Sequence, residues 1–181
     1  SDNRLYGIDL EDNSSRIVYG LENIIKFYEK NLQFNFNQSY DFNKNNNYTK
    51  KINQTSNFSD IALEAKTNFD NIFFKIDSRL GNRELEKKEM NYFFQYNDVV
   101  DLTLNYNETD AKAFQNLSTD TQFLEASVGK KMNDNVFLSV SSGLDLKNNN
   151  SPLSQTIKLS IFDECSKLDI SYTDKRFNDD Y

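Results

Sequence analysis

The sequence contains no histidine and no tryptophan, and it has one cysteine and one proline among 181 residues. Without histidine the chain cannot build a Ser-His-Asp site, a Cys-His site or an imidazole metal site. No glycine-rich phosphate loop is present, because the five glycines are scattered. Carboxylates such as Asp41 and Glu64 allow acid–base chemistry in principle. The absences nevertheless predict that the protein is not an enzyme and carries no cofactor.

The sequence also lacks a positive charge excess and a long apolar run. Lys and Arg number 21 against 28 Asp and Glu, which gives a net charge of −7. Nucleic-acid binding requires a basic face that neutralises phosphates, so the composition excludes it. Apolar clusters such as Ile72–Phe74 are far shorter than a transmembrane helix. Transmembrane β-strands need only about ten alternating residues, so these absences leave a membrane location open.

The chain begins at Ser1 without a positively charged and apolar leader, so we expect no signal peptide in it. Two explanations are open: a leader has been removed, or the chain is an internal piece of a larger protein. The length fits one domain, and we assign residues 1–181 to it.

Period-two alternation of apolar and polar side chains is the main pattern in the sequence, and it predicts β-strands. It is clearest in Thr156–Thr173, where two alternating runs flank the short link Asp163–Ser166. We expect a hairpin there, with its apolar side chains on one face and its polar ones on the other. The apolar set is Ile157, Leu159, Ile161, Leu168, Ile170 and Tyr172, and the polar set is Lys158, Ser160, Lys167, Asp169, Ser171 and Thr173.

Ten such strands are predicted, several of them about twice the usual length of five or six residues. Besides the two of the hairpin, they are Arg16–Tyr28, Asn31–Asn43, Asp60–Phe69, Asn71–Leu80, Glu84–Tyr96, Val99–Asn107, Thr121–Met132 and Asn135–Leu146.

The predicted connections alternate between tight and mostly longer ones. The tight ones are Glu29-Lys30, Asp70, Asn97-Asp98, Asn133-Asp134 and Asp163–Ser166. The others are Lys44–Ser59, Gly81–Arg83, Glu108–Thr119 and Lys147–Pro152. This arrangement is typical of outer-membrane barrels, whose tight turns lie in the periplasm. The sequence therefore predicts an all-β, antiparallel up-and-down meander of about ten long strands, forming a segment of a transmembrane outer-membrane β-barrel.

A soluble β-sandwich is the main alternative, because its strands also alternate. The long strands, the simple meander and the many Asn and charged residues on the polar face favour the barrel. Phe27, Phe69, Tyr96 and Phe162 lie next to tight turns, where the aromatic girdle of a membrane protein would lie. In a sandwich the same residues would lie at the rim of the core.

In a barrel the polar face lines the lumen, where water or a plug meets it. We expect ordinary cross-strand ion pairs there, with Lys87 and Glu89 taking part. The residues predicted to face the lumen are Asn35, Asn37, Asp41, Glu64, Lys66, Lys75, Asp77, Arg79 and Asp101.

Two stretches resemble a known family. One comprises Arg4–Asp9, Glu11–Asn13 and Ser15–Leu21, in which a Gly-Ile-Asp stretch and an acidic pair with Asn precede a strand ending in Tyr-Gly-Leu. The other comprises Phe162–Cys165 and Leu168–Tyr172, an acidic turn with cysteine that leads into a strand closing on Ser-Tyr. These stretches resemble the LptD family of lipopolysaccharide-assembly proteins; the middle of the chain is similar in strand rhythm alone.

The resemblance implies the C-terminal part of a larger barrel, without its N-terminal periplasmic domain, early strands and last strand. It implies a location in the outer membrane of a Gram-negative bacterium, where such a barrel inserts lipopolysaccharide into the outer leaflet. The implied partners are an LptE-like plug lipoprotein, the lipopolysaccharide itself, and periplasmic bridge proteins that reach the absent N-terminal domain.

The resemblance also implies that Cys165 forms an interdomain disulfide with the N-terminal domain. Many members of the family have two adjacent cysteines at this turn, whereas here Glu164 and Ser166 flank a single one. At most one such disulfide can therefore come from this segment. Two other readings stay open: another outer-membrane barrel, such as a porin-like channel or a substrate receptor, and a soluble adhesive β-domain.

Overall fold

A computed structural model describes residues 16–28, 30–42, 56–82, 84–113, 117–147 and 151–175. These residues form ten β-strands and one short 3-10 helix, η2 (Ala111–Ala113). The strands are β1 (Arg16–Phe27), β2 (Lys30–Asp41), β3 (Ile61–Phe69), β4 (Ile72–Leu80), β5 (Lys87–Asn97), β6 (Asp101–Thr109), β7 (Thr121–Asn133), β8 (Val136–Asp145), β9 (Ser151–Phe162) and β10 (Lys167–Lys175).

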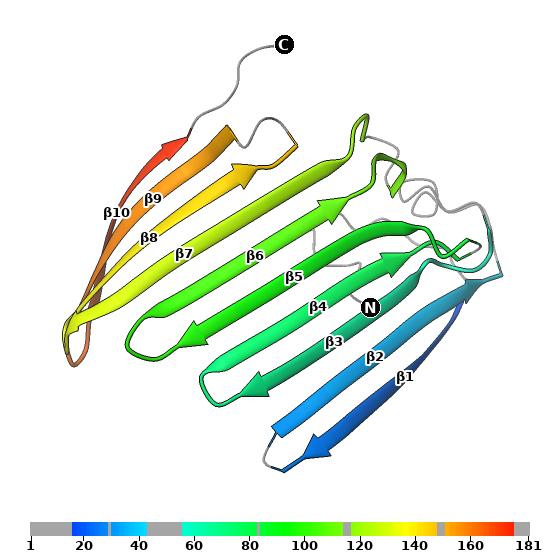
Figure 1. The fold of residues 1–181 in the computed structure, drawn as a ribbon, viewed down its shortest axis with the longest axis horizontal. Helices are drawn as coiled ribbons and strands as arrows, with labels where there is room; N and C mark the ends of the chain where they lie inside the picture. Colours follow the sequence, from blue (N-terminus) through cyan, green and yellow to red (C-terminus); the bar gives the residue numbers. More distant parts are fainter. Residues whose placement is uncertain are drawn as a thin grey trace.

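The ten described strands form one antiparallel sheet in the order of the sequence, from β1 to β10. Each strand pairs with the next along the chain, and β1 does not pair with β10, so the sheet is not closed. Figure 1 shows the tight turns along one edge of this sheet and the longer connections along the other. The predicted all-β meander of ten long strands is thus confirmed.

The predicted connection Lys147–Pro152 is wrong at its C-terminal end, because β9 already begins at Ser151. Proline lacks the amide hydrogen that a strand interior needs, but it is tolerated at a strand start or at a bulge. Pro152 occupies such a place: it is the second residue of β9, and the register with β8 shifts between Gly143 and Leu144. Likewise, Val99 and Val100 belong to the turn before β6 and not to the strand.

Tight turns connect the odd-numbered strands to the strands that follow them. Between β3 and β4 only Asp70 and Asn71 intervene, and Asp70 has a φ of 46°. A positive φ is what the two-residue turns of β-hairpins require, and Asp tolerates it better than most residues. In the turn between β9 and β10 the Asp163 amide donates to the Ser166 carbonyl oxygen at 2.9 Å. The predicted Asp163–Ser166 hairpin turn is therefore confirmed.

The described part of the chain has almost no hydrophobic core. Ala113 is its sole buried hydrophobic residue, and no large side chain in it is fully buried. Large apolar side chains stay exposed instead, among them Phe27 at 70% and Tyr172 at 71%. The described strands make one layer and not the two packed sheets that define a sandwich. The apolar face therefore has no protein partner within the described residues.

Two glycines of the opposite, polar face lie beneath phenylalanine rings. A Cβ atom added at Gly129 in β7 would collide with the ring of Phe137 in β8. A Cβ added at Gly143 in β8 would lie 2.9 Å from the Phe123 ring in β7. Aromatic side chains that cover glycines on a neighbouring strand pin the register of a sheet. Each strand of the β7–β8 pair therefore places one phenylalanine ring over a glycine of the other strand.

We expect Gly129→Val to lower the free energy of unfolding by about 1–3 kcal/mol, because the new side chain overpacks against Phe137. Adding Phe137→Ala removes the obstacle, so the double variant should lose less than the two single variants together. Urea unfolding followed by circular dichroism measures all four proteins.

Ser127→Val is the matched control for the change in strand propensity, because Ser127 lies on the same strand and face as Gly129. Additive losses in the double-mutant cycle would contradict the packing of Phe137 on Gly129.

Candidate functional site

A continuous polar face crosses all ten described strands, and the strand register determines its members. Asn35 in β2 lies opposite Glu64 in β3, and Glu64 lies opposite Asp77 in β4. Asp77 in turn pairs with Asn91, and Asn91 pairs with Asn107. Because directly opposed residues of antiparallel strands project to the same side, these five side chains form one row across the sheet.

All nine side chains predicted to face a lumen lie on this polar face. They are Asn35, Asn37, Asp41, Glu64, Lys66, Lys75, Asp77, Arg79 and Asp101. Their shared face is an observation of the structure, whereas a lumen in front of it stays a prediction. The two faces of the predicted β9–β10 hairpin are also confirmed, since Ile157 pairs with Tyr172 and Ser160 with Asp169.

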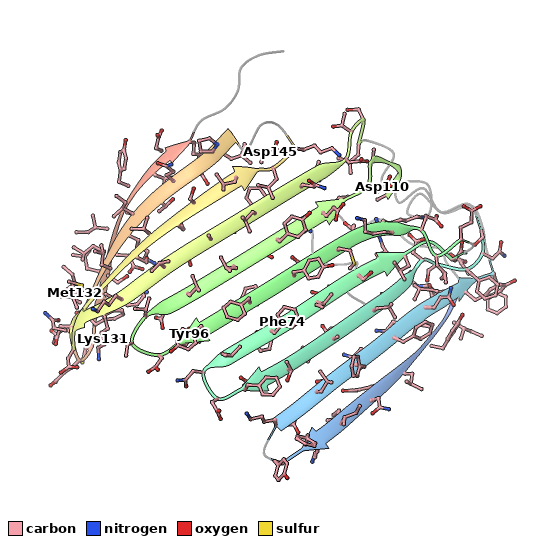
Figure 2. The ribbon with its side chains drawn as sticks, viewed as in Figure 1. Phe74, Tyr96, Asp110, Lys131, Met132 and Asp145 are labelled. Atoms are coloured by element: carbon pink, nitrogen blue, oxygen red, sulfur yellow. The ribbon has the colours of Figure 1, made fainter. Side chains whose placement is uncertain are left out.

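Figure 2 shows how the two edges of the sheet differ. Asp110 and Asp145 lie at the edge with the longer connections, and Lys131 and Met132 lie at the edge with the tight turns.

Glu64 joins three strands of the polar face through its carboxylate. Its Oε1 atom accepts a hydrogen bond from Asn35 at 2.8 Å and lies 3.0 Å from Lys66 Nζ. Its Oε2 atom lies 3.0 Å from Lys75 Nζ, which also lies 2.9 Å from Asp77. Lys66 and Lys75 are directly opposed residues, a like-charge pair that is unfavourable by itself. The shared carboxylate of Glu64 offsets this repulsion.

A second group of charges, here named the Asp60 cluster, comprises Asp60, Arg79, Lys88 and Glu89. Lys88 Nζ donates to Asp60 Oδ1 at 2.8 Å, and Arg79 Nη1 lies 3.9 Å from Asp60 Oδ2. Arg79 Nε lies 2.8 Å from Glu89 Oε2. The side chains of Asp60 and Lys88 are only 6% and 10% exposed. Buried charges of both signs in contact compensate one another, whereas either alone would be costly.

The sequence does not predict the roles of Asp60 and Lys88, and the prediction that Lys87 lies on the polar face is wrong. The register between β4 and β5 shifts at Arg79 and Leu80, so the alternation is broken there. As a result Lys88 contacts Asp60, whereas Lys87 reaches Glu108 at 2.5 Å. Glu108 pairs with Met90 and so belongs to the apolar face. A bulge leaves no clear mark in an alternating sequence, which explains the error.

A third group lies between β9 and β10, near their tight turn. Ser160 donates to Asp169 Oδ1 at 2.6 Å, while Lys158 and Lys167 each lie 3.2 Å from Asp169 Oδ2. Ser160 is 3% exposed. Four of the six polar residues of the predicted hairpin therefore form one bonded group.

The aromatic residues beside the tight turns do not all lie on one face. Phe27, Phe69 and Tyr96 belong to the apolar face by register. Phe162 pairs with Lys167, whose ammonium lies 5.6 Å from the ring centroid. Phe162 therefore belongs to the polar face, where a cation–π contact holds it, and it cannot join a girdle on the apolar face.

Cys165 is exposed at the β9–β10 turn and forms no disulfide within the chain. At the opposite edge, Asp120 in the β6–β7 connection accepts a hydrogen bond from the Ala111 amide at 2.9 Å and lies 3.4 Å from Lys147. The Ala111 hydrogen bond and, next, the Lys147 ammonium lower the pKa of Asp120 below its ordinary value.

Neither a metal site nor a membrane-spanning helix occurs in the described ranges. They contain no group of three or more His, Cys, Asp or Glu side chains that could hold a metal ion. In the same residues no helix has the length and apolar character needed to cross a membrane.

We expect Glu64→Gln to lower the free energy of unfolding by about 1 kcal/mol, because Lys66 and Lys75 then face each other without their shared counter-charge. Since these groups are partly exposed, raising the salt from 0.1 M to 1 M should shrink the loss. Urea unfolding at both salt concentrations measures the effect.

Asp134→Asn is the matched control, because Asp134 pairs with Lys131 but is 97% exposed. Its loss should stay within about 0.5 kcal/mol. A loss in Glu64→Gln that is equally small, or that salt does not reduce, would contradict the role assigned to Glu64.

Comparison with known proteins finds no counterpart of this chain. No protein-family model matches it, and neither a curated protein sequence nor a solved structure matches it.

Proposed function

We propose that the chain is part of a transmembrane β-barrel of a Gram-negative outer membrane, with its apolar face in lipid and its polar face toward an aqueous lumen. One observation carries this proposal: the described residues form a single-layer sheet whose apolar face is exposed, while the charged groups centred on Glu64, Asp60 and Asp169 lie on the other face. Outward apolar and inward polar side chains are the arrangement of outer-membrane barrels.

The exposed apolar residues favour lipid over water as the medium of that face. Ile17, Leu21 and Ile25 of β1 are 50–63% exposed, and Leu168 and Ile170 of β10 are 53–56% exposed. Soluble monomers rarely expose a contiguous apolar surface of more than a few hundred square ångströms. In lipid the same apolar surface contacts hydrocarbon, so its exposure carries no hydrophobic cost.

The free edges of β1 and β10 require further pairing in this setting. Backbone N–H and C=O groups that face hydrocarbon without a partner cost several kcal/mol each, so sheets cross membranes only as closed barrels. The ten described strands are not closed. We therefore propose that additional strands complete the barrel.

The two stretches of the sequence that resemble the LptD family extend the proposal to lipopolysaccharide assembly. By resemblance to the LptD family, the barrel inserts lipopolysaccharide into the outer leaflet and surrounds an LptE-like plug lipoprotein. The side chains that contact the plug or the sugars of the lipid would then include Asn35, Glu64, Lys75 and Asp77, which share the polar face. A porin-like channel or substrate receptor has the same two faces, so the use of Cys165 distinguishes the two functions.

Leu104→Arg tests the membrane location. Leu104 belongs to the apolar face in the middle of β6, so the charge should lower the stability of the full-length protein in lipid vesicles by about 2–4 kcal/mol. The measurement is urea unfolding from vesicles, followed by the mobility shift between folded and unfolded barrel on a gel.

Thr103→Arg is the matched control, because Thr103 is the neighbouring residue on the polar face. Thr103→Arg should lower the stability in vesicles clearly less than Leu104→Arg does. An equal loss, or folding of the wild type as a monomer without detergent or lipid, would refute the membrane location.

Cys165→Ser tests the proposed use of the thiol. On a non-reducing gel, the native full-length protein from outer membranes should migrate differently from this variant, and reductant should abolish the difference. The physical reason is that a long-range disulfide keeps the denatured chain compact. Identical mobility would contradict the interdomain disulfide and favour the channel or receptor.

A further inference from the structure

At one edge of the sheet, described residues of three connections are bonded either to one another or to the ends of the strands between them. Residues 56–60 precede β3, residues 81–82 and 84–86 lie between β4 and β5, and residues 110–113 follow β6. Asn82 Nδ2 donates to the Phe58 carbonyl oxygen at 2.9 Å, which joins the first connection to the second. The Asp110 amide donates to the Lys88 carbonyl oxygen at 2.9 Å, which joins the third connection to β5.

The Asp60 cluster lies at the point where these connections meet. Asp60 ends the first connection, Arg79 lies near the end of β4, and Lys88 and Glu89 lie at the start of β5. Arg79 also reaches the third connection, since its Nη2 atom donates to the Ala113 carbonyl oxygen at 3.4 Å. Ala113 is fully buried. One buried group of charges therefore includes Asp60 of the first connection and contacts Ala113 of the third, while the second connection is joined to the first through Asn82 and Phe58.

The energetics of this cluster make separate opening of the connections unfavourable. Moving residues 56–60 away would take Asp60 from Lys88 and leave a buried ammonium without its partner. Breaking a buried ion pair by removing one partner is strongly destabilising. Moving residues 110–113 away would expose Ala113 and break the bond to Arg79. Segments coupled in this way open as one unit.

We propose that these three connections form a single cooperative loop cap over the β3–β6 part of the polar face, held by the Asp60 cluster. The loop cap opens and closes as a whole and so controls how large a solute reaches the polar face from this edge. That the edge is the external entrance of a lumen rests on the proposed function, whereas the cooperativity of the loop cap does not.

Amide hydrogen exchange of the full-length protein in detergent tests the loop cap with Lys88→Met. The substitution removes the ammonium that holds Asp60 and keeps most of the side-chain length. Exchange should then accelerate together at Ser59, Gly81 and Ala113, one reporter from each connection, by on the order of 10- to 100-fold. The Asp163 amide, in the tight turn at the opposite edge, should not change.

Lys131→Met is the matched control, because Lys131 pairs with an exposed aspartate at the tight-turn edge. It should leave all three reporters unchanged. Acceleration at Gly81 alone, or an equal effect of Lys131→Met, would overturn the proposal. Should Lys88→Met also accelerate Asp163, which reports a global loss of structure, the milder Asp60→Asn replaces it under the same criteria.

The same experiment separates the two proposals. Joint acceleration in a protein that does not enter lipid vesicles would support the loop cap and refute the membrane barrel. If exchange accelerates at one reporter but not at the others, in a protein that enters vesicles normally, the loop cap is refuted and the membrane barrel is not.

Discussion

The continuous antiparallel register from β1 to β10 is the constraint on which the rest of the structure depends. Side chains alternate strictly along a strand, so the pairing register decides which residues share a face. A slip of one residue between β3 and β4 would move Glu64 away from Lys75 and bring Ile76 onto the polar face. The ion-paired face and the apolar face are therefore two consequences of the same ladder of backbone hydrogen bonds.

This register takes the place of a hydrophobic core in stabilising the described part of the chain. With Ala113 as the sole buried hydrophobic residue, burial of apolar side chains between protein layers contributes little. What remains within the protein is backbone pairing and the groups centred on Glu64, Asp60 and Asp169. Partly exposed ion pairs contribute modestly, so contact of the apolar face with lipid, as proposed above, would supply stability that the described residues do not provide among themselves.

The sequence was sufficient to predict the ten strands, their order and the face of the nine residues expected to line a lumen, because alternation and tight turns are local signals. It was not sufficient where the structure interrupts alternation. The register shift at Leu80 exchanges the faces of Lys87 and Lys88, and the shift at Leu144 admits Pro152 into β9. Asp60 is in phase with Glu64 and Lys66, but alternation along one strand does not reveal its contact with Lys88. The Phe137 ring over Gly129 depends on pairing between strands, which composition does not reveal.

The two edges of the sheet differ in kind, and the difference follows from connection length. At the tight-turn edge, two-residue links such as Asp70-Asn71 end the strands with exposed charges. At the other edge, residues of the described connections contact the strand ends, as where Asp60 meets Lys88 and the buried Ala113 accepts a hydrogen bond from Arg79. The described residues of the tight turns bond instead to the ends of neighbouring strands, as where the Asn97 amide donates to the Asn71 carbonyl oxygen at 2.9 Å. The proposed loop cap therefore belongs to the edge with the longer connections, where residues far apart in the sequence are bonded together.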